Sequence, residues 1–308
     1  MKILVIGGSG FIGSHIVDVL LEQNHHVKIY DIESPKFGQA CEFIKADVMD
    51  LVRLVKESEH YEAAYLIAAE ANVNRFYDSP FYSNAITSCS AINVGEAARK
   101  NGLGRILLAS TEWVYGSDPG NPDVLITEET PMTDDPDHIY TSSKIAAELF
   151  CKNYHKMYGV NYTIMRFGIP YGERARPETV TPIFIRKIMN GEEITIHGDG
   201  SQTRQFIYVK DLARGCAACL QPKAANETFN LNGGERISVI DIIRNLEAIL
   251  GRKARIKFVD QRTGQFKGRL ISSEKAKTLL GWEPRYSYRE ALEKYVQSQI
   301  ADLQSGQR

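Results

Sequence analysis

Three glycines at three-residue spacing constrain the fold of this chain more than any other feature. Gly7, Gly10 and Gly13 follow an apolar run at residues 1–6 that is typical of a buried parallel strand. Residues 14–23 then carry isoleucine, valine and leucine at helical spacing. A strand, a glycine turn and a helix in this order open a βαβ unit, in which the N–H groups at the start of the helix bind a dinucleotide diphosphate.

The alternation of strand and helix patterns continues through the first half of the chain. We predict further strands at residues 27–31, 42–46, 63–69, 105–109 and 162–167, and further helices at residues 52–58, 81–101 and 139–158. Strands that alternate with helices are typical of a doubly wound parallel sheet. The fold class is therefore expected to be α/β, with a Rossmann-like sheet.

An acidic residue at the end of the second strand indicates which dinucleotide binds. Asp31 stands where a carboxylate holds the ribose hydroxyls, and it would repel the 2′-phosphate of NADP. The sequence thus predicts NAD as the cofactor. The expected contacts in this part of the chain are Gly7, Gly10, Phe11, Ile12, Gly13 and Asp31.

A tyrosine and a lysine four residues apart form the candidate catalytic pair. Tyr140 and Lys144 lie on one face of the helix predicted at residues 139–158. A nearby ammonium and a nicotinamide cation both lower the pKa of a tyrosine, which then accepts a hydroxyl proton while a hydride leaves to NAD. Thr111, at the carboxyl end of a predicted strand, is expected to hydrogen-bond the same substrate hydroxyl.

Together these motifs resemble the extended short-chain dehydrogenase/reductases, specifically the NAD-dependent sugar-nucleotide epimerase/dehydratase family. The resemblance rests on GGSGFIG at residues 7–13, Asp31, ADV at 46–48, STEWVYG at 110–116 and the Tyr140–Lys144 pair, and it extends to about residue 300. It implies that Thr111, Tyr140 and Lys144 form the catalytic triad, that Asp47 and Val48 hold the adenine, that Ala68 and Ala69 line the NAD site, and that Lys144 also binds the nicotinamide ribose.

The second half of the chain resembles the substrate lobe of the same family. GDGSQTRQFIYV at residues 198–209 matches its signature, in which Arg204 would bind the substrate diphosphate, and Arg262 resembles a later phosphate-binding arginine. Arg269 is expected to face the phosphates or the sugar. The implied partner is a nucleotide diphosphate sugar, linked to uridine or thymidine. We therefore predict a NAD-binding Rossmann domain at residues 1–168, with later segments able to cross back, and a smaller α/β nucleotide-sugar lobe at residues 169–308.

Four residues depart from the family pattern. Ile169 stands where an asparagine commonly helps to hold the substrate phosphates, and Gln205 stands where an aspartate is usual. Sugar 4,6-dehydratases typically carry an Asp-Glu pair after the catalytic threonine, whereas this chain has Glu112 and Trp113. Tryptophan has no acid or base to offer at neutral pH, so plain 4,6-dehydration is disfavoured.

These features favour an epimerase that works through a transient 4-keto sugar, with Tyr140 as the base. The alternative keeps the same first oxidation and then eliminates water, with Glu112 as the acid, or loses carbon dioxide from a uronic acid. In that case Arg174, Arg176 or Arg269 would bind the carboxylate. A third hypothesis, a non-catalytic NAD-binding module, is disfavoured because the whole catalytic set is present.

Composition narrows the partners and the setting. The net charge of -1 gives no electrostatic reason to bind nucleic acid or a membrane, and the apolar runs are too short to span a bilayer. The chain opens directly on a strand-like run, and five scattered cysteines do not suggest a disulfide framework or a metal site, so a reducing cytosol is expected. Cys216 and Cys219 are expected to be core residues. Relatives often form homodimers through two helices per subunit, which would be residues 81–101 and 139–158 here.

Overall fold

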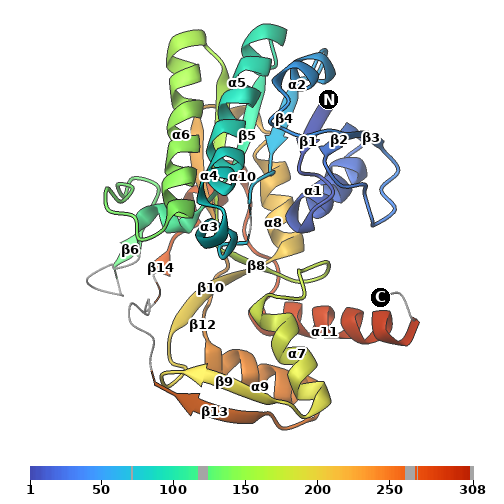
Figure 1. Ribbon diagram of the computed structural model, residues 1–308, viewed down its shortest axis with the longest axis vertical. Helices are drawn as coiled ribbons and strands as arrows, with labels where there is room; N and C mark the ends of the chain where they lie inside the picture. Colours follow the sequence, from blue (N-terminus) through green and yellow to red (C-terminus); the bar gives the residue numbers. More distant parts are fainter. Residues whose placement is uncertain (71, 117–123, 261–267, 269, 306–308) are drawn as a thin grey trace.

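The computed structural model describes residues 1–70, 72–116, 124–260, 268 and 270–305, which form a larger and a smaller lobe (Figure 1). The larger lobe holds a seven-stranded sheet in the order β11-β7-β5-β4-β1-β2-β3, and all its strands are parallel. Its strands are β1 (Lys2–Ile6), β2 (His26–Asp31), β3 (Glu42–Lys45), β4 (Ala63–Leu66), β5 (Arg105–Thr111), β7 (Asn161–Phe167) and β11 (Glu227–Leu231). The predicted doubly wound parallel sheet is confirmed.

Helices cover both faces of this sheet because its strands are apolar on both sides. In β1, Ile3 and Val5 point into one hydrophobic cluster, and Leu4 and Ile6 point into another. The first cluster is covered by α1 (Phe11–Glu22), α8 (Val209–Ala218) and α10 (Glu274–Leu280), and the second by α2 (Leu51–Glu57), α5 (Ser90–Asn101) and α6 (Ile139–Tyr158). This two-sided burial explains why the strands lack an apolar–polar alternation.

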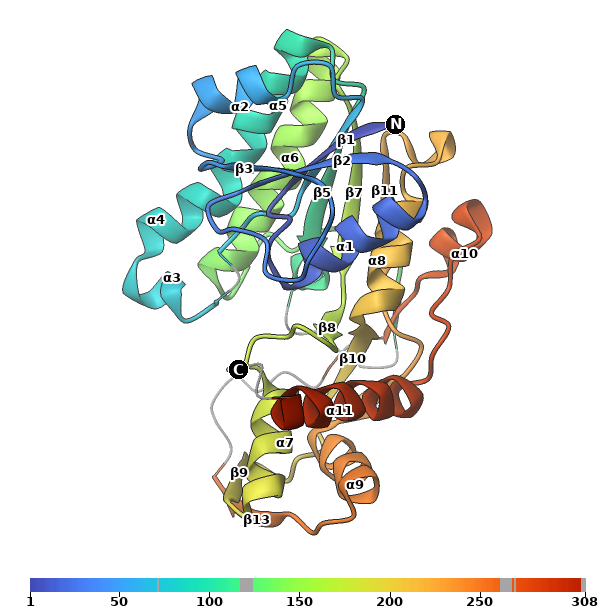
Figure 2. The same ribbon diagram turned by 90° about the vertical axis from the view of Figure 1, so that its right-hand side faces the viewer.

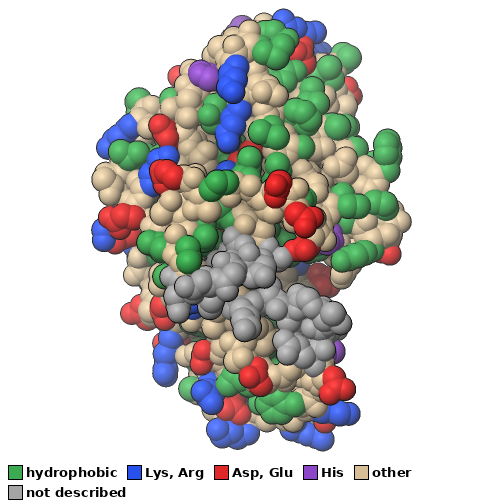
Figure 3. Space-filling model, turned by 90° about the vertical axis from the view of Figure 1, so that its left-hand side faces the viewer, with side chains coloured by type: hydrophobic (Ala, Val, Ile, Leu, Met, Phe, Trp, Pro, Cys, Tyr) green, Lys and Arg blue, Asp and Glu red, His purple; other side chains and the backbone are tan. Residues whose placement is uncertain are grey.

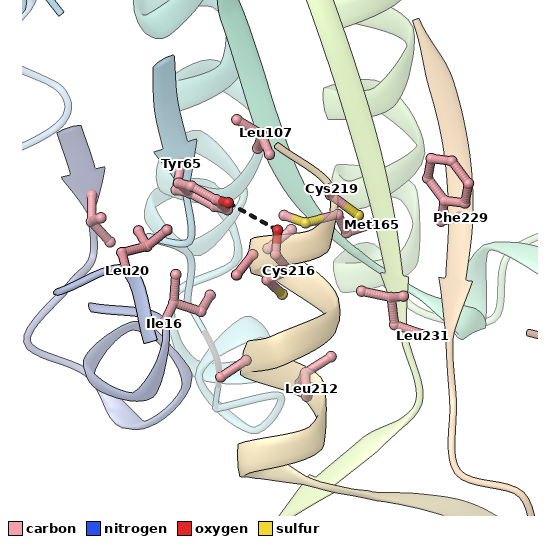
Figure 4. Packing of buried hydrophobic residues seen from close by; sticks show 14 of the residues in the cluster. Ile16, Leu20, Tyr65, Leu107, Met165, Leu212, Cys216, Cys219, Phe229 and Leu231 are labelled. Atoms are coloured by element: carbon pink, nitrogen blue, oxygen red, sulfur yellow. Dashed lines mark hydrogen bonds between the residues drawn. The ribbon is translucent and has the colours of Figure 1, made fainter. Parts of the chain in front are cut away.

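Helix α8 lies in the centre of the first cluster, as Figure 4 shows. Its Cys216 and Cys219 are fully buried among apolar side chains, as expected from their apolar surroundings in the sequence. The Tyr65 hydroxyl on β4 donates a hydrogen bond of 2.8 Å to the Cys216 carbonyl. The two cysteines therefore help to fix α8 on the sheet.

The helix predicted at residues 81–101 is interrupted by one widened turn. It comprises α4 (Pro80–Asn84), the π-helical segment η1 (Ala85–Cys89) and α5. The Ser88 hydroxyl donates to the Asn84 carbonyl at 2.8 Å, and the Asn84 side chain accepts from Ser143 on α6 at 2.7 Å. Serine bonds to the preceding turn compete with regular helix bonds, which accounts for the widening.

The chain passes between the two lobes several times (Figure 2). After β7 it enters the smaller lobe through β8 (Ile169–Tyr171), which pairs with β10 (Thr203–Tyr208) and, through β10, with β12 (Arg236–Ser238). The smaller lobe also holds α7 (Val180–Asn190), β9 (Glu193–His197), α9 (Val239–Leu250), β13 (Arg255–Val259) and α11 (Tyr288–Ser305). Because α8 and α10 pack on the large sheet and β11 is one of its strands, residues 169–308 do not form one continuous lobe.

Charged side chains of both signs occur on both lobes in the face drawn in Figure 3. Among the described residues, no helix combines the length and the apolar character that crossing a bilayer requires.

Candidate active site

The glycine turn lies at the point where the strand order reverses, between β1 and β4. Gly7 has a φ of +87°, and a Cβ atom there would lie 2.5 Å from the Ala68 amide nitrogen. A Cβ on Gly13 would collide with the Gly7 carbonyl, whereas the nearest atom to a Cβ on Gly10 would be 3.6 Å away. The backbone thus packs tightly on one side of the turn and stays open on the other, where no described side chain caps α1. This open cradle with unpaired N–H groups fits a dinucleotide diphosphate.

The other predicted cofactor residues lie at the carboxyl ends of the neighbouring strands. Asp31 ends β2, and its carboxylate accepts the amides of Ser9 and Glu33 at 2.9 and 3.0 Å. Asp47 and Val48 follow β3, and Ala68 and Ala69 follow β4. These residues therefore share one edge of the sheet with the glycine turn, and Phe11 and Ile12 form the start of α1. Ligands of open α/β sheets bind at this edge.

Helix α6 presents its predicted catalytic residues to the end of β5. The Tyr140 phenol lies close enough to the Thr111 hydroxyl for that hydroxyl to act against the rise of the Tyr140 pKa. One turn further along, the Lys144 ammonium donates to the Ala109 carbonyl at 2.9 Å. The structure thus brings Thr111, Tyr140 and Lys144 together, as the helical spacing predicts.

Burial dominates the protonation of this pair. It raises the pKa of Tyr140 to about 12, against the opposing effects of the Thr111 hydrogen bond and the positive charge of Arg176. It also lowers the pKa of Lys144 to about 8. A phenol that resists ionisation beside an amine that readily gives up its proton depends on further positive charge to become a base. A nicotinamide cation bound beside Tyr140 would provide such charge.

A third residue continues this helix face, and sequence reasoning missed it. Glu148 lies one turn after Lys144 and is fully buried. Its carboxylate accepts two bonds from Arg166 on β7, at 2.9 and 2.7 Å, and one from Ser110 on β5, at 2.6 Å. Positions 140, 144 and 148 of α6 therefore contact residues 111, 109 and 110 of β5. The spacing of four residues was the available signal for Glu148.

Aromatic rings and a histidine hold Tyr140 from the sides. The Trp113 and Phe76 rings meet the phenol edge-on, each with ring centroids 5.7 Å apart. The Nδ1 atom of His138, the N-cap of α6, accepts the Tyr140 amide at 3.0 Å. His138 and Phe76 were not predicted from the sequence. A histidine at the start of the catalytic helix was the signal for His138.

The structure describes only some of the residues that were predicted to bind the substrate. Arg204 on β10 is partly buried, and the charge of Glu112 counteracts the lowering of its pKa by burial, so these two side chains lie close together. Gln205 binds the backbone of Gly233 and Ile271, and Ile169 packs against the apolar cluster of the smaller lobe. Arg262 and Arg269 lie outside the described residues.

Arg174 and Arg176, the arginines considered for a substrate carboxylate, have separate environments. Arg174 pairs with Asp18 on α1 at 2.7 Å and covers the Phe37 ring, so it serves the contact between the lobes. Arg176 influences Tyr140 electrostatically and is therefore near the catalytic centre.

Known proteins resemble this chain over most of its length. The sequence model described as "NAD dependent epimerase/dehydratase family" matches residues 3–232. A UDP-glucuronate 4-epimerase of Thermodesulfobacterium geofontis is 31% identical, over 95% of this chain and 94% of the relative. The crystal structure of a Thermotoga maritima UDP-glucose 4-epimerase with UDP-glucose superposes with a TM-score of 0.90, at 29% identity, over 98% of this chain and 100% of the other. A Bacillus cereus UDP-glucuronic acid 4-epimerase, in complex with UDP-glucuronic acid and NAD, has a TM-score of 0.86 at 30% identity, over 97% and 100% of the two chains.

Proposed function

We propose that the chain, which belongs to the NAD-dependent epimerase/dehydratase family, is a 4-epimerase of UDP-sugars. The observation that carries the proposal is the meeting of Thr111, Tyr140 and Lys144 at the end of β5, beside a turn that fits a dinucleotide. Similar proteins that act as 4-epimerases on UDP-glucose and UDP-glucuronic acid support the choice of substrate class.

Tyr140, Thr111 and Lys144 each have a separate role in the proposed reaction. The Tyr140 phenolate accepts the proton of the sugar 4-hydroxyl, and the Thr111 hydroxyl hydrogen-bonds the same oxygen. The Lys144 ammonium, fixed on the Ala109 carbonyl, stabilises the phenolate. NAD held by the glycine turn and Asp31 would supply the hydride acceptor, and later the hydride donor, for C4 of the sugar. Once the 4-keto sugar has turned its other face, Tyr140 gives the proton back to the oxygen at C4, and the configuration is inverted.

The residues after Thr111 favour epimerisation over elimination. Elimination of water needs an acid at C6 and a base at C5, whereas epimerisation needs only the group that handles the 4-hydroxyl proton. Trp113 has no titratable group, and its ring contacts the Tyr140 phenol instead. Glu112 alone supplies a carboxylate at this position.

Arg176 makes UDP-glucuronate a candidate substrate beside UDP-glucose. Its charge acts on Tyr140, and a carboxylate at C6 is the neighbouring substituent of a sugar whose 4-hydroxyl meets that tyrosine. The same contact would orient a uronic acid for loss of carbon dioxide from the 4-keto sugar, which is the second candidate reaction.

The test is incubation of the NAD-loaded protein with UDP-glucose, UDP-glucuronate and their 4-epimers, followed by mass spectrometry and proton NMR. We expect a product of unchanged mass with altered couplings at H4. A product lighter by water or carbon dioxide would replace the assignment with dehydratase or decarboxylase. Arg176→Gln should raise the KM for the glucuronate more than for the glucose substrate.

We also infer that two copies associate through the outer face of α4, α5 and α6. Phe81 on α4 and Leu149 on α6 are 85% and 44% exposed, which is high for apolar side chains on adjoining helices.

A further inference from the structure

Asn232 lies at the binding edge of the large sheet, two strands away from the catalytic threonine. Thr111 of β5 is in register with Phe167 of β7, which is in register with Leu231 of β11. Gly168 directly follows β7 and Asn232 directly follows β11, and the Gly168 amide donates to the Leu231 carbonyl at 3.2 Å. Because β7 lies between β5 and β11, the strand that carries Thr111 and the strand that precedes Asn232 are two strand spacings apart, a distance of roughly 10 Å.

The carboxamide of Asn232 is buried without satisfying its hydrogen-bonding groups. The residue is 1% exposed, and neither its Oδ1 nor its Nδ2 atom has a partner among the described residues. Its backbone is fixed, because the Asn232 amide donates to the Ser273 hydroxyl at 3.0 Å. A buried amide with both polar atoms unpaired lowers the free energy of unfolding relative to an apolar side chain of the same size.

The space for this carboxamide exists because residue 168 is a glycine. A Cβ atom on Gly168 would lie only 2.6 Å from the Asn232 Oδ1 atom. The following residue, Ile169, packs its side chain against the apolar cluster of the smaller lobe and has no polar group in that side chain. Asn232 therefore places a carboxamide close to residue 169, where the family pattern commonly has an asparagine.

We propose that the Asn232 carboxamide binds a hydroxyl group of the substrate sugar. Because both Nδ2 and Oδ1 lack partners, the matching ligand group both accepts and donates a hydrogen bond. A sugar hydroxyl does both, whereas a diphosphate oxygen only accepts and would leave Oδ1 unpaired. The inference rests on the proposed function, since it takes a sugar bound at Tyr140 as its starting point.

The experiment compares Asn232→Leu with wild type, using NAD-loaded protein and calorimetric titration of UDP-glucose, UDP-glucuronate and UDP. We expect the variant to keep or raise the Tm, to lose about tenfold in affinity for the sugar nucleotide, and to bind UDP within twofold of wild type. Asn232→Ala serves if leucine overpacks the site. Asn190→Leu, at an exposed asparagine of the smaller lobe, is the matched control and should change none of these values.

Two results would overturn the inference while leaving the proposed function intact. Unchanged affinity for the sugar nucleotide that wild type binds, with a raised Tm, would mean that Asn232 has no ligand role. An equal loss of affinity for UDP would assign the amide to the nucleotide or diphosphate instead of the sugar. If wild type itself binds UDP but no UDP-sugar, the proposed function fails, and this inference falls with it.

Discussion

Gly10 and Gly13 belong to the same turn but have different surroundings, so alanine should affect them differently. A Cβ on Gly13 would collide with the Gly7 carbonyl, whereas a Cβ on Gly10 would lie 3.6 Å from the Gly7 carbonyl oxygen, an ordinary van der Waals contact. We expect Gly13→Ala to lower the free energy of unfolding by about 1–3 kcal/mol. Gly10→Ala should leave stability nearly unchanged but weaken NAD binding by about tenfold, because its methyl group enters the space of the diphosphate. Urea unfolding measures the stability of each variant, and NAD titration measures its affinity for the cofactor. Equal losses of stability in the two variants would contradict this prediction.

Lys144 is expected to control the pH dependence of the reaction through Tyr140. Burial raises the pKa of Tyr140 to about 12. We expect the Lys144 ammonium one helical turn away, together with a bound nicotinamide cation, to favour the phenolate. Lys144→Met should reduce kcat by roughly 100- to 10,000-fold. The remaining activity should rise steadily with pH between 6 and 10, because hydroxide alone then ionises the phenol. Lys144→Arg keeps the charge and should retain part of the neutral-pH activity; a Met variant with an unshifted profile would refute this role.

At the scale of elements, the buried Glu148–Arg166 pair connects α6 to β7 beneath the catalytic residues. Glu148→Gln leaves the Arg166 guanidinium buried without its carboxylate, and we expect it to lower the free energy of unfolding by about 3–5 kcal/mol. The double variant with Arg166→Met should lose less than the sum of the single variants. Because Glu148 raises the pKa of Lys144, Glu148→Gln should also shift the Lys144 ionisation toward acid pH. Chemical unfolding and pH–rate profiles separate the two effects.

His15 connects α1 to the first loop of the smaller lobe and should make this contact sensitive to acid. Its Nε2 atom is 3.0 Å from the Glu173 carbonyl, and burial lowers its pKa from 6.5 to about 4. The unfolded chain therefore binds more protons than the folded chain between these values, and stability falls as the pH drops from 6.5 toward 4. The loss should approach about 3 kcal/mol. His15→Gln should flatten the stability curve over this range in urea unfolding at stepped pH, and an unchanged slope would show that other groups cause the acid loss.

For the molecule as a whole, the sequence predicted the features that depend on local pattern, namely the strands, the helices and the catalytic pair. Residues 1–168 alternate between short apolar runs and segments of helical period, and the catalytic pair of α6 follows from helical spacing alone. The pairing of β11 with β7 joins segments about sixty residues apart, and the short run at residues 227–231 gives no sign of its partner. The environments of Glu148 and Asn232 depend on such distant pairings, so their roles emerge only from the three-dimensional arrangement.

Association of two copies is the prediction that belongs to the whole molecule. Phe81 and Leu149 lie on helices that pack beside one another, and an apolar surface of this kind is stable in water when a second surface covers it. We expect wild type to sediment at twice the 34.6 kDa of the chain and Phe81→Glu/Leu149→Glu to sediment as a monomer. Phe258→Glu, at a 56% exposed position of β13 in the smaller lobe, is the matched control and should leave the dimer intact. Since the proposed interface lies outside the catalytic set, the monomeric variant should still bind NAD; a monomeric wild type would refute the interface.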